Sequence, residues 1–289
     1  MPDDLDTQAL EEQQSYFDEH PFPGMMFPNN VTKSLFSHIM EKNDLYKIIK
    51  QILKPEWRLL DAGCGTGEFT GYLSVDSNVE VIGIDFSRRT IEWAKNLQGS
   101  IPGMGNLLFT KEDVFNLNHD ALGRFDVVLA LGLFFSIPNQ QIGLNRLADI
   151  LKPGGIAIFG LFDPVARGYL RLKIWLLQGI SGRFYNREKI AREVLLKDRT
   201  EDSEIKWYIN QLTEKIFNFH SPEKAQSMMS EAGLTVTDCF PQMRLFGDMY
   251  PDTLELERSW SPPPIQFAAQ IRWLLNNTHG YFVLTGKKV

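Results

Sequence analysis

A glycine-rich turn after a short apolar run constrains this chain more than any other feature. Residues 59–67 read Leu-Leu-Asp-Ala-Gly-Cys-Gly-Thr-Gly, so glycines occupy alternate positions directly after an acid. Glycine is required where the backbone turns sharply with positive φ or approaches a ligand without a Cβ in the way. In open α/β sheets such turns lie at the carboxyl ends of strands, where ligands bind. The stretch therefore predicts a buried strand that ends in a tight, ligand-facing turn and opens onto a helix.

The segments after the turn alternate as expected for an α/β sheet. A second predicted strand, 80–84, ends in Asp85, roughly 20 residues past the glycines, where an acid suits a ribose diol. A third strand near 107–109 leads to Asp113, whose carboxylate can accept a hydrogen bond from an adenine amino group, with Val114 beside the ring. The remaining predicted elements are a helix over 68–74, a helix over 88–97 with Ser87 as N-cap, a strand over 125–131, a helix over 144–151, a turn at 152–155 and a strand over 156–160.

Two other ligand-binding turns do not match these residues. The dinucleotide fingerprint is Gly-x-Gly-x-x-Gly, whereas the glycines here follow Asp61 at positions 63, 65 and 67. The phosphate-cradling loop requires Gly-Lys-Ser/Thr, which this turn lacks. Neither of these two ligand-binding turns therefore describes the glycines of this chain.

Five ordered motifs resemble those of the class I S-adenosylmethionine-dependent methyltransferases. They are the Asp-x-Gly-x-Gly-x-Gly turn at 61–67, Gly83-Ile84-Asp85, Glu112-Asp113-Val114, Phe125-Asp126-Val127-Val128 and Leu151-Lys152-Pro153-Gly154-Gly155. The resemblance covers residues 45–160 densely and resumes at 221–240 and 281–287. It implies an α/β fold with a seven-stranded doubly wound sheet, the last strand antiparallel, and helical lid insertions. It also implies S-adenosyl-L-methionine as cofactor. The predicted cofactor-binding residues are Asp61, Gly63, Cys64, Gly65, Gly67, Asp85, Phe86, Asp113, Val114 and Leu131.

Charge and cysteine content narrow the partners and the compartment. The net charge of −6 argues against a nucleic-acid partner, because such binding depends on cationic contacts to phosphates. The two cysteines, Cys64 and Cys239, form no recognisable disulfide framework or metal site. The first residues are acidic, unlike a secretory signal, and no apolar run reaches the roughly 18 residues of a membrane-spanning helix. We therefore expect a cytoplasmic protein without a membrane span and without a bound metal.

Three additions surround the predicted cofactor-binding core at 45–161. They are an N-terminal cap segment, 1–44, a lid insertion, 162–220, and an insertion at 241–279 within the C-terminal part of the core, 221–289. The cap and the lid are apolar and aromatic, so we expect them to close over the cofactor and hold the acceptor. The aromatic residues of the lid either line an acceptor pocket or form the insertion's own core. Residues 169–177 either contact a membrane or partner as an amphipathic helix or, as we favour, pack against the core.

The transfer chemistry names few catalytic residues. Displacement at a sulfonium requires alignment of acceptor, methyl carbon and sulfur, and a base is needed only when the acceptor begins protonated. His20 is the best candidate base, with Tyr16 beside it in the cap segment. His-His often follows strand four in relatives, but Phe135-Ser136 stands here. Residues 131–135 also lack the Asn/Asp-Pro-Pro-Tyr/Phe that typifies methyltransferases of nucleobase or glutamine nitrogens.

Three functional hypotheses are compatible with these residues. The first, which we favour, is methyl transfer to a small-molecule acceptor whose reacting atom is oxygen, nitrogen or carbon. The second is a methyltransferase for protein or RNA, which a basic cleft mouth would favour. The third is a cofactor-binding scaffold without transfer activity, which the sequence cannot distinguish from an enzyme because binding residues do not report transfer.

Overall fold

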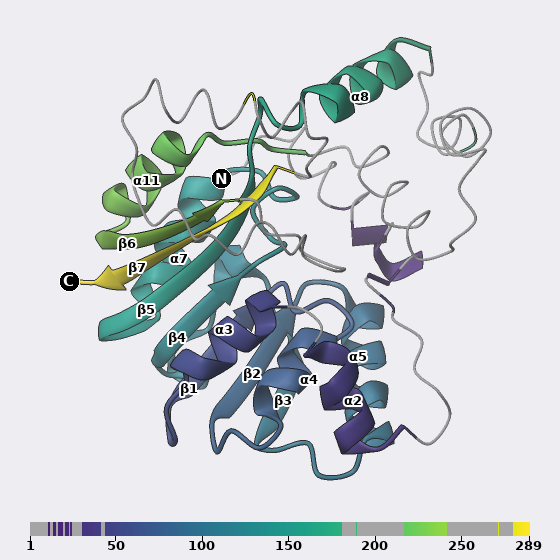
Figure 1. Cartoon of the computed structure of the whole chain (residues 1–289), viewed down its shortest axis with the longest axis vertical. Coiled ribbons are helices and arrows are strands. Elements are labelled where there is room, and N and C mark those ends of the chain that lie inside the picture. Colours follow the sequence, from purple (N-terminus) through teal and green to yellow (C-terminus); the bar gives the residue numbers. More distant parts are fainter. Residues whose placement is uncertain are drawn as a thin grey trace.

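A seven-stranded sheet organises the chain in its computed structural model (Figure 1). The structure describes residues 11, 14, 15, 17–19, 21, 22, 24, 31–41, 44–180, 189, 217–241, 271 and 280–289, with only the backbone at 44, 177–180 and 239–241. The sheet order is β3-β2-β1-β4-β5-β7-β6, and β7 runs antiparallel to both of its neighbours. This confirms the predicted doubly wound sheet with an antiparallel last strand. The strands are β1 (Arg58–Ala62), β2 (Glu80–Asp85), β3 (Leu107–Lys111), β4 (Phe125–Ala130), β5 (Leu151–Phe162), β6 (Leu234–Pro241) and β7 (Tyr281–Lys288).

Helices cover both faces of the sheet because successive strand residues point to opposite sides. Leu59 belongs to a core shared with α2, α3, α4 and α5, whereas the next residue, Leu60, belongs to a core shared with α6, α7 and α11. The central strands are buried on both faces, which explains their unbroken apolar runs. The described helices are α2 (Lys33–Met40), α3 (Asp44–Ile52), α4 (Glu68–Ser74), α5 (Arg88–Ser100), the 3₁₀ turn η1 (Val114–Asn116), α6 (His119–Leu122), α7 (Gln140–Asp149), α8 (Gly168–Ile180) and α11 (Pro222–Glu231).

Most predicted elements are confirmed, and two predictions were wrong in detail. Residues 152–155, predicted as a turn, belong to β5 as a bulge, because Leu151 pairs with Phe125 and Ile156 pairs with Val127. An ion pair of 2.8 Å between Lys152 Nζ and Asp126 Oδ2 joins the bulge to β4. The helix predicted over 144–151 spans 140–149 instead, because its polar first turn gives no apolar periodicity.

Some predicted boundaries fall outside the described residues. Most of the 162–220 and 241–279 insertions lie there, so their proposed roles stay predictions. Within the predicted cap segment, α2 packs into the core through Phe36 and Met40, which are almost fully buried. Among the described helices, none combines the length and apolar character required to cross a membrane.

A tyrosine at the start of β7 fixes the end of β4. The hydroxyl of the buried Tyr281 donates a hydrogen bond of 2.5 Å to the carbonyl oxygen of Leu131. Gly160 of β5 makes this possible, since a Cβ at that position would lie 1.7 Å from the Tyr281 hydroxyl. The position of the backbone just after β4 therefore depends on glycine at position 160 of β5, which leaves room for the Tyr281 ring.

We predict that Gly160→Ala lowers the free energy of unfolding by about 1–3 kcal/mol, the usual cost of overpacking a core. The physical reason is the clash with Tyr281, which must move and lose its bond to Leu131. Gly99→Ala in α5 is the matched control, because no atom lies within 4 Å of its added Cβ. It should be neutral or stabilising by up to about 1 kcal/mol. Urea unfolding measures both, and equal stability of the two variants would contradict the prediction.

Candidate functional site

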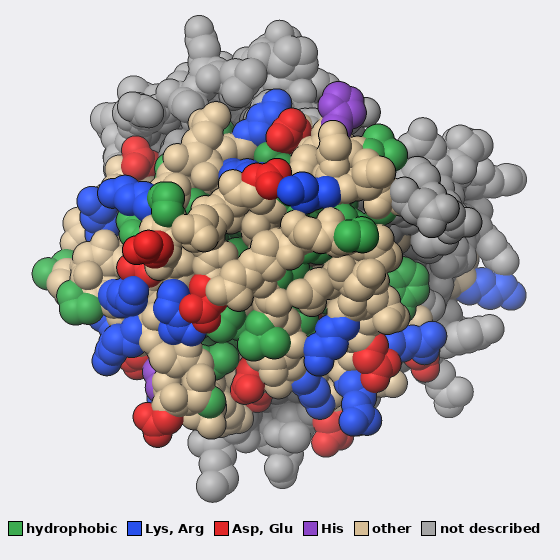
Figure 2. Space-filling view, turned by 90° about the horizontal axis from the view of Figure 1, so that it is seen from below, with side chains coloured by type: hydrophobic (Ala, Val, Ile, Leu, Met, Phe, Trp, Pro, Cys, Tyr) green, Lys and Arg blue, Asp and Glu red, His purple; other side chains and the backbone are tan. Residues whose placement is uncertain are grey.

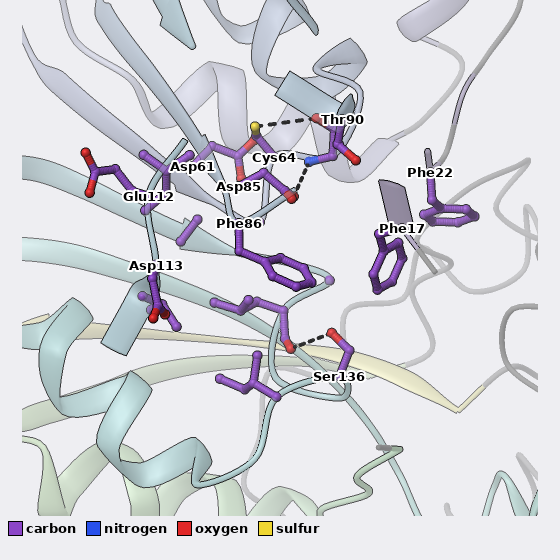
Figure 3. Close-up of a pocket in the computed structure, with 18 of the residues that line it drawn as sticks. Phe17, Phe22, Asp61, Cys64, Asp85, Phe86, Thr90, Glu112, Asp113 and Ser136 are labelled. Atoms are coloured by element: carbon purple, nitrogen blue, oxygen red, sulfur yellow. Dashed lines mark hydrogen bonds between the residues drawn. The ribbon is translucent and has the colours of Figure 1, made fainter. Parts of the chain in front are cut away.

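A cavity of about 560 Å³ lies at the carboxyl ends of β1, β2 and β4 (Figure 3). Its walls come from the glycine turn after β1, the end of β2, residues 111–116 after β3 and residues 131–137 after β4. Residues of α3, α4 and the N-terminal part of the chain complete the walls. Parallel strands bring these segments together because their carboxyl ends share one edge of the sheet.

Nine of the ten predicted cofactor-binding residues line this cavity, namely Asp61, Gly63, Cys64, Gly65, Asp85, Phe86, Asp113, Val114 and Leu131. Gly67 does not, and its role is packing. It begins α4 with a φ of 87°, and a Cβ there would lie 2.7 Å from the Phe109 ring and 2.8 Å from the Ala94 Cβ. The alternating glycines therefore serve two purposes, because Gly63 and Gly65 face the cavity while Gly67 lets α4 approach β3 and α5.

Backbone hydrogen bonds lock the glycine turn onto the end of β2. The N–H groups of Gly63 and Cys64 both donate to the carbonyl oxygen of Ile84, at 2.8 and 2.9 Å. The Gly65 N–H donates to Asp85 Oδ2 at 3.2 Å, and the Ser87 N–H donates to Asp85 Oδ1 at 3.0 Å. The Asp85 carboxylate is thereby held between the turn and the start of α5. Each of its oxygens keeps acceptor capacity for a ligand.

The cavity walls carry a strong excess of acids. Burial raises the pKa of Asp61 to about 6, although a 2.6 Å hydrogen bond from the Thr70 hydroxyl acts in the opposite direction. Burial likewise raises the pKa of Asp85 to about 6, and the hydrogen bonds from the Ser87 and Gly65 N–H groups oppose this shift. Glu68 is also nearly fully buried and accepts from the Thr66 hydroxyl. Among the described residues the lining acids are Glu11, Asp61, Glu68, Asp85, Glu112 and Asp113, whereas the basic side chain is Lys111. Such a cavity attracts a cation and disfavours phosphate.

Asp113 also organises its own loop. Its carboxylate accepts from the Phe115 N–H at 2.9 Å and from Asn116 Nδ2 at 3.2 Å, which caps η1. This cap places the buried Val114 in the cavity wall. The acid and the apolar residue beside it therefore form one unit, as the Glu112-Asp113-Val114 motif predicts.

The N-terminal strap, defined as the described residues within 11–24, is hydrogen-bonded to the glycine turn and to the start of α5. At one end, the Thr66 N–H donates to the Phe22 carbonyl at 3.0 Å, and the Gly24 N–H donates to Thr66 Oγ1 at 2.8 Å. At the other, the hydroxyl of Ser87, the N-cap of α5, donates to Asp18 Oδ1 at 2.6 Å. Glu11, Gln14, Phe17 and Phe22 of the strap line the cavity.

Aromatic rings form the other part of the lining. Phe17 meets the Phe86 ring edge-on with centroids 6.0 Å apart, and Figure 3 shows Phe17 and Phe22 together at one side of the cavity. Tyr46 stacks on Phe69 at 3.9 Å. Sequence reasoning missed Tyr46, because it precedes the motifs as one apolar position of an amphipathic helix. Burial, with Glu68 nearby, raises the pKa of Tyr46 well above its usual value, so its phenol stays protonated.

The predicted catalytic residues His20 and Tyr16 lie outside the described residues and stay predictions. Two other histidines of the described part, His119 and His220, do not line the cavity. The aromatic residues of the predicted lid that the structure describes either pack in the core or are exposed to solvent. Phe162 is buried, and Phe217 and Phe219 pack against the same core, so these three belong to the hydrophobic interior. Tyr169 and Trp175 are exposed, while Phe184, Tyr185, Trp207 and Tyr208 lie outside the described part.

The buried Asp61 predicts an unusual pH dependence of stability without ligand. Its folded-state pKa of about 6 exceeds the ordinary value of 3.8, so the folded chain binds this proton more tightly than the unfolded chain. Its contribution to stability is present below about pH 4 and is lost as the pH rises through about 6. Ionised Asp61 therefore destabilises the folded protein at neutral pH.

We predict that the change in the free energy of unfolding caused by Asp61→Asn is more stabilising at pH 7.5 than at pH 4.5, by about 1–3 kcal/mol. Urea unfolding without ligand measures this change at each pH. The difference between the two pH values is the readout, because any fixed cost of the amide cancels. Asp149→Asn on the exposed end of α7 is the control and should show no such difference. A pH-independent effect of Asp61→Asn would contradict the prediction.

Comparisons with known proteins agree with this geometry. A family model described as a methyltransferase domain matches residues 53–233. A demethylmenaquinone methyltransferase from Staphylococcus saprophyticus is 27% identical over 197 residues, covering 65% of this chain and 75% of that protein. One from Staphylococcus aureus strain JH9 is 28% identical, with 61% and 67% covered. An uncharacterized protein from Synechococcus, syc1184_c, is 30% identical over 47% of this chain, which spans about a third of that protein (34%).

Solved structures share the fold at low sequence identity. A putative sarcosine dimethylglycine methyltransferase from Galdieria sulphuraria superposes with a TM-score of 0.53 and 13% identity, over 96% of this chain and 98% of that chain. The structure of PKMT2 from Rickettsia typhi gives a TM-score of 0.56 and 17% identity, over 84% and 51%. The family match extends over more than half of the chain and includes every segment that walls the cavity except the strap and α3. The chain therefore belongs to the methyltransferase-domain family, and its sheet has the class I methyltransferase fold.

Proposed function

We propose that the cavity binds S-adenosylmethionine and that the enzyme transfers the methyl group to a small, apolar acceptor. The observation that carries this proposal is the pairing of an acid-lined wall with an aromatic wall in one cavity. S-adenosylmethionine bears a sulfonium and an ammonium and no phosphate, so it matches the acid excess that would repel a nucleotide. When bound, the cofactor supplies an electrophilic methyl carbon.

The residues present fit the nucleoside and amino-acid parts of this cofactor. Asp85 would accept hydrogen bonds from the ribose hydroxyls, and Asp113 one from the adenine amino group, with Val114 and Phe86 against the ring. Asp61 would face the ammonium. The Thr90 hydroxyl supports this assignment independently, since it is buried in the same wall and has no hydrogen-bond partner among the described residues. A ligand that enters the cavity can supply that partner.

Binding a cation also offsets the electrostatic cost of burying ionised carboxylates in the cavity wall. The carboxylates of Asp61 and Asp85 are disfavoured in their ionised form by burial, as their raised pKa values indicate. A ligand cation nearby favours the ionised form. A bound cofactor would place a sulfonium charge among these acids, and its demethylated product would not. The acids therefore attract the methylated cofactor more strongly than its neutral thioether product.

The aromatic wall supports a small-molecule acceptor. Phe17, Phe22, Phe69 and Phe135 present ring surfaces, and the relatives named demethylmenaquinone methyltransferases act, by that name, on a ring compound. Inside the cavity an RNA acceptor is disfavoured, because the described lining carries six acids and one lysine and would repel phosphates. Positioning of the acceptor would supply much of the rate enhancement. The Tyr46 phenol is no candidate base, because burial raises its pKa and keeps it protonated.

We predict that Asp85→Asn weakens S-adenosylmethionine binding at least about tenfold, because a charge-assisted hydrogen bond to the ribose is lost. The amide keeps the size of the side chain, so the fold should persist. Isothermal titration calorimetry measures the affinity, and the exposed Asp149→Asn is the control, with unchanged affinity expected. Unchanged affinity in a folded Asp85→Asn protein would remove Asp85 from the site.

We predict that Asp18→Ala weakens cofactor binding about fivefold, the effect of one hydrogen bond, because the strap loses its anchor on Ser87. Glu19→Ala is the matched control, since Glu19 is the exposed neighbour. Hydrogen exchange should slow over residues 11–24 of the wild-type protein when cofactor is added, and slow less in Asp18→Ala. Identical exchange with and without cofactor would show that the strap is only a structural segment.

Transfer itself is tested by incubation with methyl-labelled S-adenosylmethionine and a cell extract separated into small-molecule, RNA and protein fractions. Label in the small-molecule fraction, dependent on Asp85, supports the proposal. Label in RNA or protein would replace the acceptor class. Tight cofactor binding with no labelled product in any fraction would favour a scaffold without transfer activity.

A further inference from the structure

Helix α8 presents an apolar stripe to solvent, contrary to the expectation that residues 169–177 pack against the core. The exposed fractions are 56% for Tyr169, 53% for Leu172, 67% for Trp175 and 46% for Leu176. At about 100° per residue these four side chains span about 120° of the helix surface. Leu170 and Ile174 point the other way, toward the body of the protein, where Leu170 is buried. The helix therefore has two apolar sides, and one of them faces outward.

Basic residues flank the exposed stripe on both sides. On the same helical projection, Arg171 follows one edge of the stripe and Lys173 the other, and both are exposed. Apolar and aromatic side chains between two basic borders suit the surface of an anionic bilayer, where tryptophan and tyrosine are favoured at the level of the headgroups. A purely apolar protein partner would leave Lys173 without a complement, whereas Arg171 donates to the Pro164 carbonyl oxygen at 3.2 Å.

The charge of the surrounding sequence supports an anionic partner. In a chain with a net charge of −6, the stretch 164–192 contains seven basic residues and one acidic residue, Glu188. The face of the molecule shown in Figure 2 differs, because basic and acidic side chains are intermingled there. The basic residues of the stretch are Arg171, Lys173, Arg183, Arg187, Lys189 and Arg192, together with Arg167, which is buried and does not contribute to a surface.

The helix lies at the edge of the sheet where the cavity opens. It follows the carboxyl end of β5, and Figure 1 shows it projecting beyond the layers of the core. A row of rings connects the two places. Phe135 of the cavity wall packs against Phe217 at 5.2 Å, Phe217 packs against Phe219 at 4.8 Å, and the Arg171 guanidinium lies 5.6 Å from the Phe219 ring.

We propose that α8 docks this enzyme on an anionic phospholipid membrane, with Tyr169, Leu172, Trp175 and Leu176 in the interface and Lys173 against the headgroups. The docking is inferred from the exposed side chains of α8 alone. That it brings an apolar acceptor from the bilayer to the cavity rests on the proposed function. The contact is peripheral, and the stripe is short, so binding is reversible and depends on both the apolar and the basic residues.

The test is flotation of the full-length protein with vesicles of equal parts phosphatidylglycerol and phosphatidylcholine, compared with phosphatidylcholine alone. The wild-type protein should float with the anionic vesicles. Salt at 0.5 M should release part of it, because salt screens the attraction between the exposed basic residues and the anionic headgroups. Lys173→Glu should reduce the partition coefficient at least about fivefold, the effect of one basic residue near an anionic surface. Lys95→Glu on the exposed side of α5 is its control.

Trp175→Ser should reduce the partition coefficient by a similar factor, whereas Trp93→Ser should not, although Trp93 is 40% exposed on α5. Failure of the wild-type protein to float, or equal flotation of Trp175→Ser, would overturn the proposal. So would a wild-type dimer that Trp175→Ser converts to monomer without vesicles, because the stripe would then be an interface between copies. Calorimetry of S-adenosylmethionine binding separates the two ideas, since flotation without cofactor binding would refute the proposed function alone.

Discussion

The hydrogen bonds between the glycine turn and the end of β2 are the constraint on which the site depends. Two consecutive N–H groups, of Gly63 and Cys64, share the carbonyl of Ile84, and a third, of Gly65, reaches the carboxylate of Asp85. This arrangement requires positive φ at Gly63 and Gly65, 76° and 55°, which side chains other than glycine rarely tolerate. The turn, the acid and the start of α5 are thereby fixed as one unit, and the cavity is built around it.

The cavity stores unfavourable electrostatic energy that a cationic ligand can relieve. Asp61 and Asp85 lie close together where burial disfavours their charges. A structural ion pair would satisfy such acids with lysine or arginine, as Asp126 and Lys152 do on the opposite edge of the sheet. In the cavity, the described lining offers Lys111 alone against six acids. Perturbed acids of this kind in a concave site are typical of ligand-binding positions.

Peripheral segments complete the walls of the cavity around this common core. The strap reaches both the Thr66 backbone and the Ser87 side chain, so it closes a wall that the sheet alone leaves open. On the other side, Tyr281 and Gly160 fix the backbone of Leu131, from which the loop carrying Phe135 and Ser136 departs. Relatives with the same sheet can change these segments without disturbing the turn, which explains why fold similarity alone does not identify a substrate.

The sequence alone determined the order of strands β1 to β5, the glycine turn and the acids at the ends of β1, β2 and β3, because these follow from local backbone requirements and from periodicity over a few residues. Only the tertiary structure decided which glycine faces the cavity, since Gly63 and Gly67 differ in their neighbours rather than in their local sequence. It likewise placed Tyr46 in the wall and turned one side of α8 to solvent. These outcomes depend on contacts between segments far apart in the chain, such as Tyr281 with Leu131, and no local pattern encodes such contacts.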